Sequence, residues 1–117
     1  MKFSEMPYKR IDMDEVKKTY RDIIDRTKAA SSGEEQFEIH REYYKFMDDV
    51  RTSMELAMIR HDIDTTDEFY EKESDFYDEV TPIISQYENE YGKVLYDSPY
   101  RDYLESKIGK VTFKNIE

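Results

Sequence analysis

The sequence predicts an all-α protein, an antiparallel helical bundle of four or five helices with no sheet core. Apolar residues recur three and four positions apart along most of the chain, which is the spacing of one face of a helix. Only three glycines and three prolines interrupt the 117 residues, so the helices should be long. Ser, Thr or Asp precedes three of the apolar stretches with Glu three positions later, an arrangement that caps helix starts.

The first helix is expected over residues 12–30, after an irregular N-terminal segment at 1–11. Asp12 and Glu15 form the capping box, and helical spacing then relates the residues Val16, Tyr20, Ile23, Ile24 and Thr27. On the exposed face, an acid precedes a base by four positions in two pairs, the order that stabilises a helix: Asp14 with Lys18 and Asp22 with Arg26.

The second helix is expected to begin after a box formed by Ser32 and Glu35 and to reach His61. Its apolar series comprises Phe37, Tyr44, Met47, Val50, Met54, Ala57 and Met58. The polar segment 62–67 favours a turn, and Thr65 with Glu68 is predicted to cap a third helix. That helix carries Phe69, Phe76, Tyr77 and Val80.

Pro82 leaves two alternatives, because proline either kinks a helix or suits the first position of a new one. The apolar series resumes at Ile83 and continues to Leu95. Ser98 and Pro99 then predict the cap and first position of a short helix that ends at Gly109. The helical domain is thus expected over residues 12–110, and 111–117 as the start of a truncated following segment.

The core of this bundle must be aromatic. Leu, Ile, Val and Phe together number 24 of the 117 residues. This apolar fraction is only just above the level at which chains with a strong net charge are usually disordered. Eleven tyrosines can supply the missing apolar area, since a tyrosine buries its ring while its hydroxyl bonds a polar group.

The formal net charge is −10, which argues against binding to nucleic acid. Residues 62–90 hold eleven acids and one base, so the whole net charge arises there. This stretch is interpreted either as a solvated helix face or as a surface for a positive partner. Without cysteine, a disulfide scaffold is excluded, and without a long apolar run no membrane span is predicted, so a cytoplasmic protein is expected.

Motifs for catalysis or metal binding are weak. Neither His40 nor His61 belongs to a His-Glu-x-x-His or Glu-x-x-His pattern, and no glycine-rich phosphate loop is found. Residues 62–73 partly match a calcium loop, but Asp67 stands where the loop requires glycine. We therefore expect no catalytic residue, no metal ligand and no cofactor in this chain.

Three stretches carry a family resemblance: Met1–Arg10, Ile59–Glu73 and Asp97–Arg101. Together they are similar to the N-terminal region of oligoendopeptidase F-like zinc metallopeptidases, relatives of thimet oligopeptidase. The resemblance extends over essentially the whole chain. It implies a helical domain whose partner is the catalytic domain of the same polypeptide, where zinc is bound outside this segment and short peptides are cleaved in a deep cleft.

The resemblance transfers no catalytic or zinc residue, because no position here matches those motifs. Because a rigid helical wall excludes folded proteins by sterics and admits flexible peptides, we hypothesise that these helices wall the substrate cleft and restrict it to short peptides. Arg60, His61 and Asp64 are the candidates for facing substrate or the neighbouring domain; alternatively, they fix the turn through caps and ion pairs. A free-standing acidic helical adaptor that binds a partner protein is the other function considered. As a severed domain, the chain is expected to self-associate through an exposed apolar patch.

Overall fold

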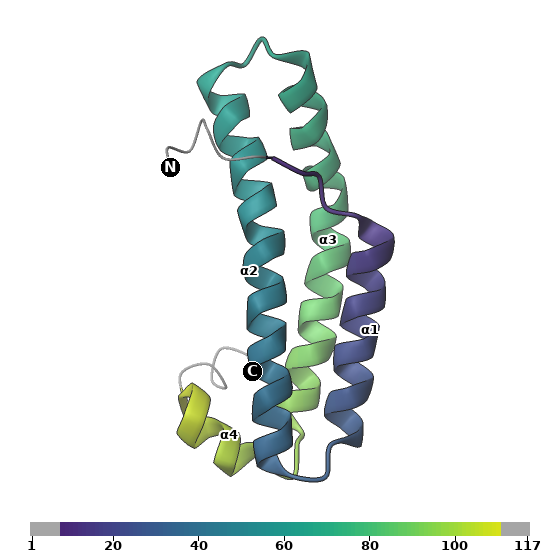
Figure 1. The fold of residues 1–117 in the computed structure, drawn as a ribbon, viewed down its shortest axis with the longest axis vertical. Helices are drawn as coiled ribbons and strands as arrows, with labels where there is room; N and C mark the ends of the chain where they lie inside the picture. Colours follow the sequence, from purple (N-terminus) through teal and green to yellow (C-terminus); the bar gives the residue numbers. More distant parts are fainter. Residues whose placement is uncertain (1–7, 111–117) are drawn as a thin grey trace.

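The computed structural model describes residues 8–110, which form a bundle of four helices: α1 (Met13–Ala29), α2 (Gly33–Ile63), α3 (Glu68–Tyr96) and α4 (Arg101–Ile108). The first three helices lie side by side, with α2 antiparallel to α1 and α3, and the short α4 lies at an angle beside the start of α2 (Figure 1). No strand occurs in this part of the chain, which confirms the all-α prediction. The predictions for residues 1–7 and 111–117 lie outside the described residues.

Two helix starts are capped as predicted. The Asp12 carboxylate accepts hydrogen bonds from the amides of Asp14 and Glu15 at 3.0 and 3.3 Å, and Ser32 Oγ accepts one from the Glu35 amide at 3.1 Å. Both side chains thereby satisfy amides that have no partner within their own helix. α1 lies within one residue of its expected bounds, whereas α2 extends two residues past His61 to Ile63.

The caps predicted for the last two helices are wrong. Asp67 is the N-cap of α3, because its carboxylate accepts from the amides of Phe69 and Tyr70 at 2.9 and 3.3 Å, so the box starting at Thr65 does not form the cap. Ser98 Oγ accepts from the Tyr100 amide at 3.0 Å and so shapes a turn, while α4 begins at Arg101 without a side-chain cap. At α3 a different residue forms the cap, and before α4 the Ser98 oxygen accepts from a turn amide.

Pro82 lies inside α3, so the helix continues through it and the alternative of a new helix is wrong. Proline removes one helical hydrogen bond, the one to the carbonyl of Asp78. Pro82 and Asp78 are both exposed, so water can reach this turn of the helix. Thr81 Oγ also donates to the Tyr77 carbonyl at 2.6 Å on the same turn.

The core consists of two clusters along the bundle, in which tyrosines pack among aliphatic residues. Tyr20 is fully buried and stacks on Tyr87 with ring centroids 5.0 Å apart. The buried members are Val16, Tyr20, Met47, Val50, Ala57, Tyr77, Val80 and Ile84 in one cluster, and Ile23, Ile24, Ile39, Tyr91, Leu95 and Leu104 in the other. The expectation of an aromatic core holds only in part: Tyr20, Tyr77 and Tyr91 are buried, but most buried apolar residues in the described range are aliphatic and none is a phenylalanine.

Three residues of the predicted apolar series are exposed instead. Tyr44, Met58 and Phe69 expose 58%, 46% and 54% of their surface. Met58 and Phe69 lie near the turn between α2 and α3, where the hairpin extends beyond α1 and has no third helix beside it (Figure 1). Conversely Gln36, His40 and Glu73 are buried although they are polar.

The segment before α1 is held against α3 by a buried carboxylate. Glu73 is 3% exposed and accepts hydrogen bonds from Tyr8 Oη at 2.6 Å and from Arg10 Nε at 2.9 Å, with a second bond from the Arg10 guanidinium. Tyr8 Oη also lies 2.9 Å from Tyr77 Oη, which accepts from the Ile11 amide at 3.3 Å. The Arg10 guanidinium, with help from the Tyr8 hydroxyl, lowers the pKa of Glu73 despite its burial.

At the other end, Gly33 allows α4 to pack closely against the start of α2. A Cβ at Gly33 would lie 2.7 Å from Cδ1 and 2.9 Å from Cγ of Tyr103. The nearby Gln36 side chain donates from Nε2 to the Thr27 carbonyl at 2.8 Å and accepts from Ser98 Oγ at 2.5 Å. These contacts join α1, α2 and the segment that leads into α4.

We predict that Glu73→Gln lowers the free energy of unfolding by about 1–3 kcal/mol near pH 7, because it removes a charge-assisted bond to Arg10. Since the folded pKa of Glu73 is lowered, its contribution is present above the unfolded pKa of about 4.3 and is lost as the pH falls through the folded value. Urea unfolding of both proteins at about pH 7 and about pH 3 should therefore show a smaller difference in acid.

The exposed Glu71→Gln on the same helix is the control and should change stability by less than about 0.5 kcal/mol. Equal effects of the two substitutions at neutral pH would contradict the role of Glu73.

We also predict that Gly33→Ala destabilises the chain by about 1–3 kcal/mol through overlap with Tyr103. Helix propensity alone predicts the opposite sign, a gain of about 1 kcal/mol. Thermal unfolding of Gly33→Ala, Tyr103→Ala and the double variant should show that Gly33→Ala costs less once the ring is gone. Stabilisation by Gly33→Ala in the otherwise unchanged chain would refute the overlap.

Candidate functional site

The three residues predicted to face substrate or a neighbouring domain lie at the α2–α3 junction, and two have local partners there. Arg60 Nη1 donates to Tyr70 Oη at 2.9 Å, which joins the end of α2 to the start of α3. Asp64 accepts from the amide and the hydroxyl of Thr66 at 3.0 and 2.6 Å, and these bonds lower its pKa. His61 is half-buried, and its Nδ1 has no hydrogen-bond partner. A role toward substrate stays a prediction for all three.

The partial calcium loop at 62–73 uses its carboxylates in other ways. Asp64 bonds Thr66, Asp67 caps α3, and Glu73 accepts from Tyr8 and Arg10. Glu73 occupies the twelfth position, which must supply a bidentate ligand in a calcium loop. Its oxygens are already bonded to the N-terminal segment, so the geometry does not favour this hypothesis.

Between residues 8 and 110, no set of side chains is arranged to bind the zinc that the resemblance implies. His40 and His61 both lie on α2, 21 positions apart, which places them about 30 Å from each other. No group of three or more His, Asp and Glu side chains in the described range is arranged to hold a metal ion. No chemical step through zinc is therefore assigned to these residues.

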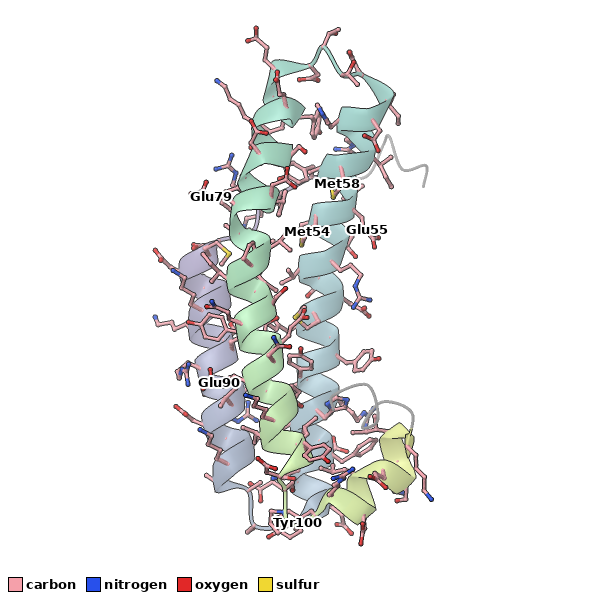
Figure 2. All side chains as sticks on the ribbon, turned by 180° about the vertical axis from the view of Figure 1, so that it is seen from behind. Met54, Glu55, Met58, Glu79, Glu90 and Tyr100 are labelled. Atoms are coloured by element: carbon pink, nitrogen blue, oxygen red, sulfur yellow. The ribbon has the colours of Figure 1, made fainter. Side chains whose placement is uncertain are left out.

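A groove between α2 and α3 contains a cluster of aromatic and ionisable side chains that sequence reasoning did not identify. Its main cavity has a volume of about 230 Å³ and is lined by His40, Tyr43, Tyr44, Met47, Arg51, Glu88, Tyr91, Gly92 and Leu95. A second cavity of about 210 Å³ shares Met47, Arg51 and Glu88 with it and extends to Met54. Figure 2 shows Met54 on the side of α2 that faces α3.

His40 is the buried polar residue of this groove and is 6% exposed. Its Nδ1 lies 2.8 Å from Tyr91 Oη, and the two rings are nearly parallel, with centroids 5.9 Å apart. Tyr91 also stacks on Tyr43 at 4.1 Å, and Tyr44 meets His40 edge-on at 5.4 Å. Burial lowers the pKa of His40 and raises the pKa of Tyr91, so both are neutral at pH 7.

The Nε2 of His40 is buried and has no hydrogen-bond partner. Tyr91 Oη can donate to Nδ1, which places the single proton of the neutral imidazole on Nε2. The other tautomer would leave both the Tyr91 hydroxyl hydrogen and Nε2 unpaired, so we assign the first. His40 therefore carries an unsatisfied N–H donor.

Two groups of opposite charge also line the cavity. Arg51 is mostly exposed and lies 3.7 Å from Asp48. Glu88 is exposed as a residue, but partial desolvation of its carboxyl group in the groove raises its pKa, and the positive charge of Arg51 opposes this rise. The cavity lining thus combines aromatic side chains, one cation and one carboxyl group, while the unpaired Nε2 of His40 is closed to solvent.

A signal for this groove is present in the sequence. His40, Tyr44, Met47 and Arg51 follow one face of a helix, as do Glu88, Tyr91 and Leu95. Each set alone is typical of an ordinary core face. Only the alignment of α2 with α3 brings the two sets together.

The acidic residues of 62–90 lie on the hairpin turn and along α3. Glu90 pairs with Arg21 at 2.9 Å, and Glu73 pairs with Arg10. The exposed acids are Asp62, Asp64, Glu68, Glu71, Asp75, Asp78, Glu79 and Glu88. Whether this acidic surface binds a positive partner stays a prediction.

In residues 8–110, no helix combines the length and the apolar character that a bilayer span requires.

The chain matches known proteins across nearly its full length. The family described as the Peptidase M3 N-terminal domain matches residues 3–117. No curated protein matches the chain.

Three solved structures share the fold, each with a TM-score of 0.95. One is a PZ peptidase A with an inhibitor, and it is 40% identical to this chain. The match covers 98% of this chain and 20% of the PZ peptidase A chain. A protein described as a putative oligoendopeptidase F is 37% identical, and the match covers 99% of this chain and 20% of that protein. A second putative oligoendopeptidase F, from Bacillus anthracis str. Ames, is 34% identical, and the match covers 99% of this chain and 21% of that protein.

This chain therefore spans about a fifth of the length of these solved proteins. The family match and the structural similarity agree with the resemblance carried by the three sequence stretches. The chain belongs to the family of N-terminal domains of M3 peptidases, the group that includes the oligoendopeptidase F-like enzymes.

Proposed function

We propose that this chain is the noncatalytic N-terminal helical domain of a zinc metallo-oligoendopeptidase and that it walls the substrate cleft. The observation that carries the proposal is the near-complete superposition on about a fifth of each peptidase chain. In this proposal, zinc and the groups that activate water lie in the remaining polypeptide.

The shape of the bundle suits a wall. It measures 51 Å along its longest axis, and two buried clusters hold its three long helices together. A wall of packed helices excludes folded proteins by steric clash and admits flexible peptides. Selection for short substrates then needs no catalytic group in this domain.

The partner we propose is the catalytic domain of the same polypeptide. Met58, Ile63 and Phe69 are exposed near the α2–α3 turn, where no other described helix covers them. Exposed apolar side chains of this size mark contact surfaces when they gather in one patch. The isolated chain would use the same surface to self-associate. A cytoplasmic location stays part of this proposal.

We predict that the isolated 117-residue chain does not hydrolyse a quenched fluorescent peptide, with or without added zinc. The reason is that no residue pattern here activates water. Fluorescence should stay at the level of the buffer, while an intact oligoendopeptidase gives a positive control. Zinc-dependent hydrolysis that co-purifies with the chain would overturn the noncatalytic assignment.

The cleft role predicts the behaviour of a chimera in which this chain replaces the matching segment of PZ peptidase A. The 40% identity and the TM-score of 0.95 make such a replacement structurally feasible. The chimera should cleave a short fluorescent peptide and leave intact, on the same timescale, a folded protein that carries the same sequence in an exposed loop. If a chimera with an opened wall, made by deleting residues 55–75, still cleaves the short peptide and still rejects the folded protein, the wall has no role in selection.

A further inference from the structure

The tip of the α2–α3 hairpin, residues 56–77, extends beyond the start of α1, so no other helix of the described residues lies beside it (Figure 1). Its buried apolar residues are Leu56, Ala57 and Tyr77. Two short helical segments gain little stability on their own, because helices in proteins depend on tertiary packing. The segment 8–11, which precedes α1, packs on this tip and takes the place of the missing helix.

This segment is bound to α3 by a directed chain of hydrogen bonds that ends on a carboxylate. The Ile11 amide donates to Tyr77 Oη at 3.3 Å, and Tyr8 Oη donates to Glu73 at 2.6 Å. Since each phenol has one hydrogen, the 2.9 Å contact between the two hydroxyls is a donation from Tyr77 to Tyr8. Arg10 Nε donates to the same carboxylate at 2.9 Å. Glu73 is therefore the final acceptor for two residues of the segment.

Aromatic contacts strengthen the attachment. The Tyr8 ring meets the rings of Phe69 and Tyr70 edge-on, with centroids 6.1 and 5.8 Å apart. The Arg10 guanidinium lies over the Phe76 ring, 4.2 Å from its centroid. Edge-on aromatic pairs and a cation above a ring are both favourable. The segment thus contacts α3 from its first turn onward.

We propose that residues 8–11 form a latch that keeps the tip ordered, and that detaching the latch opens the tip while the rest of the bundle stays folded. Without the latch, the Glu73 carboxylate and the Tyr77 hydroxyl lose these partners in buried positions, which is costly. Both groups regain hydrogen bonds to water when the two helices of the tip separate.

The opening ends on α3 at Pro82. The helix lacks the backbone hydrogen bond from this position to the Asp78 carbonyl, so the turn next to the tip is already weakened. Beyond Pro82, Tyr91 and Leu95 are buried in the cluster that also contains residues of α1 and α4. That part of the bundle therefore does not require the latch.

The latch couples the start of the chain to a surface that is distant in sequence. The tip carries Met58, Ile63 and Phe69, the exposed apolar side chains proposed above to contact a catalytic domain. Opening of the tip changes their relative positions, so detachment of residues 8–11 alters this surface. The coupling goes beyond the proposed function, because it acts within this chain alone.

The test is hydrogen exchange of the backbone amides of the 117-residue chain, followed by NMR, which reports the free energy of each local opening. The amides of residues 69–77 should share one protection factor, at least tenfold lower than those of residues 20–27 and 84–95. Equal protection of these sets would overturn the proposal, because the tip would then open only with the whole bundle.

Tyr8→Phe keeps the ring but removes the hydroxyl that donates to Glu73. Protection of residues 69–77 should fall about tenfold or more, since a hydrogen bond to a charged group is lost. Lys9→Gln changes an exposed charge of the same segment and should leave protection within about twofold. Unchanged protection of the tip in Tyr8→Phe, or an equal loss in Lys9→Gln, would refute the latch.

The double variant Tyr8→Ala, Arg10→Ala removes both side chains that bind Glu73. The tip should then lose its protection, while residues 20–27 and 84–95 keep protection factors at least tenfold higher than the tip. A tip that stays protected would show that the latch does not hold it. Loss of protection along the whole chain would also overturn the proposal, because the rest of the bundle would then depend on the latch.

Discussion

The fold depends on pairing the hydroxyl groups of its buried tyrosines. With few aliphatic residues and a net charge of −10, the chain adds Tyr20, Tyr77 and Tyr91 to the aliphatic residues of its core. A tyrosine can be buried at low cost only when its hydroxyl has a partner. Tyr77 bonds the segment before α1, and Tyr91 bonds His40 of α2. Each polar contact therefore joins two elements that are distant in sequence.

This requirement links the core to the candidate site. His40 is buried because Tyr91 needs a hydrogen-bond partner between α2 and α3. An imidazole has two nitrogens, so pairing one of them leaves the other, Nε2, buried without a partner. The packing of Tyr91 and this unpaired donor thus have a common cause. Several side chains that pack the helices together also line the α2–α3 cavity.

The sequence was a good guide to local structure and a poorer one to long-range contacts. Helical spacing and the caps at Asp12 and Ser32 predicted α1 and the start of α2, because these signals involve neighbouring residues. Glu73 looked like one acid among eleven, and its burial depends on Arg10, 63 positions away. His40 looked like an isolated histidine for the same reason. Spacing along one helix shows a face but not the helix that covers it.

The buried polar contacts at the two ends of the bundle also fix how far each helix is shifted along its neighbour. Apolar faces with helical periodicity tolerate sliding by a full turn, because similar side chains then meet again. Gln36 bonds Thr27 and Ser98 at one end, and Glu73 bonds Tyr8 and Arg10 near the other. A slip of one turn would separate each of these groups by about 5 Å and leave them buried without partners. The bundle thus has a single axial register, which holds both edges of the α2–α3 groove at a constant offset.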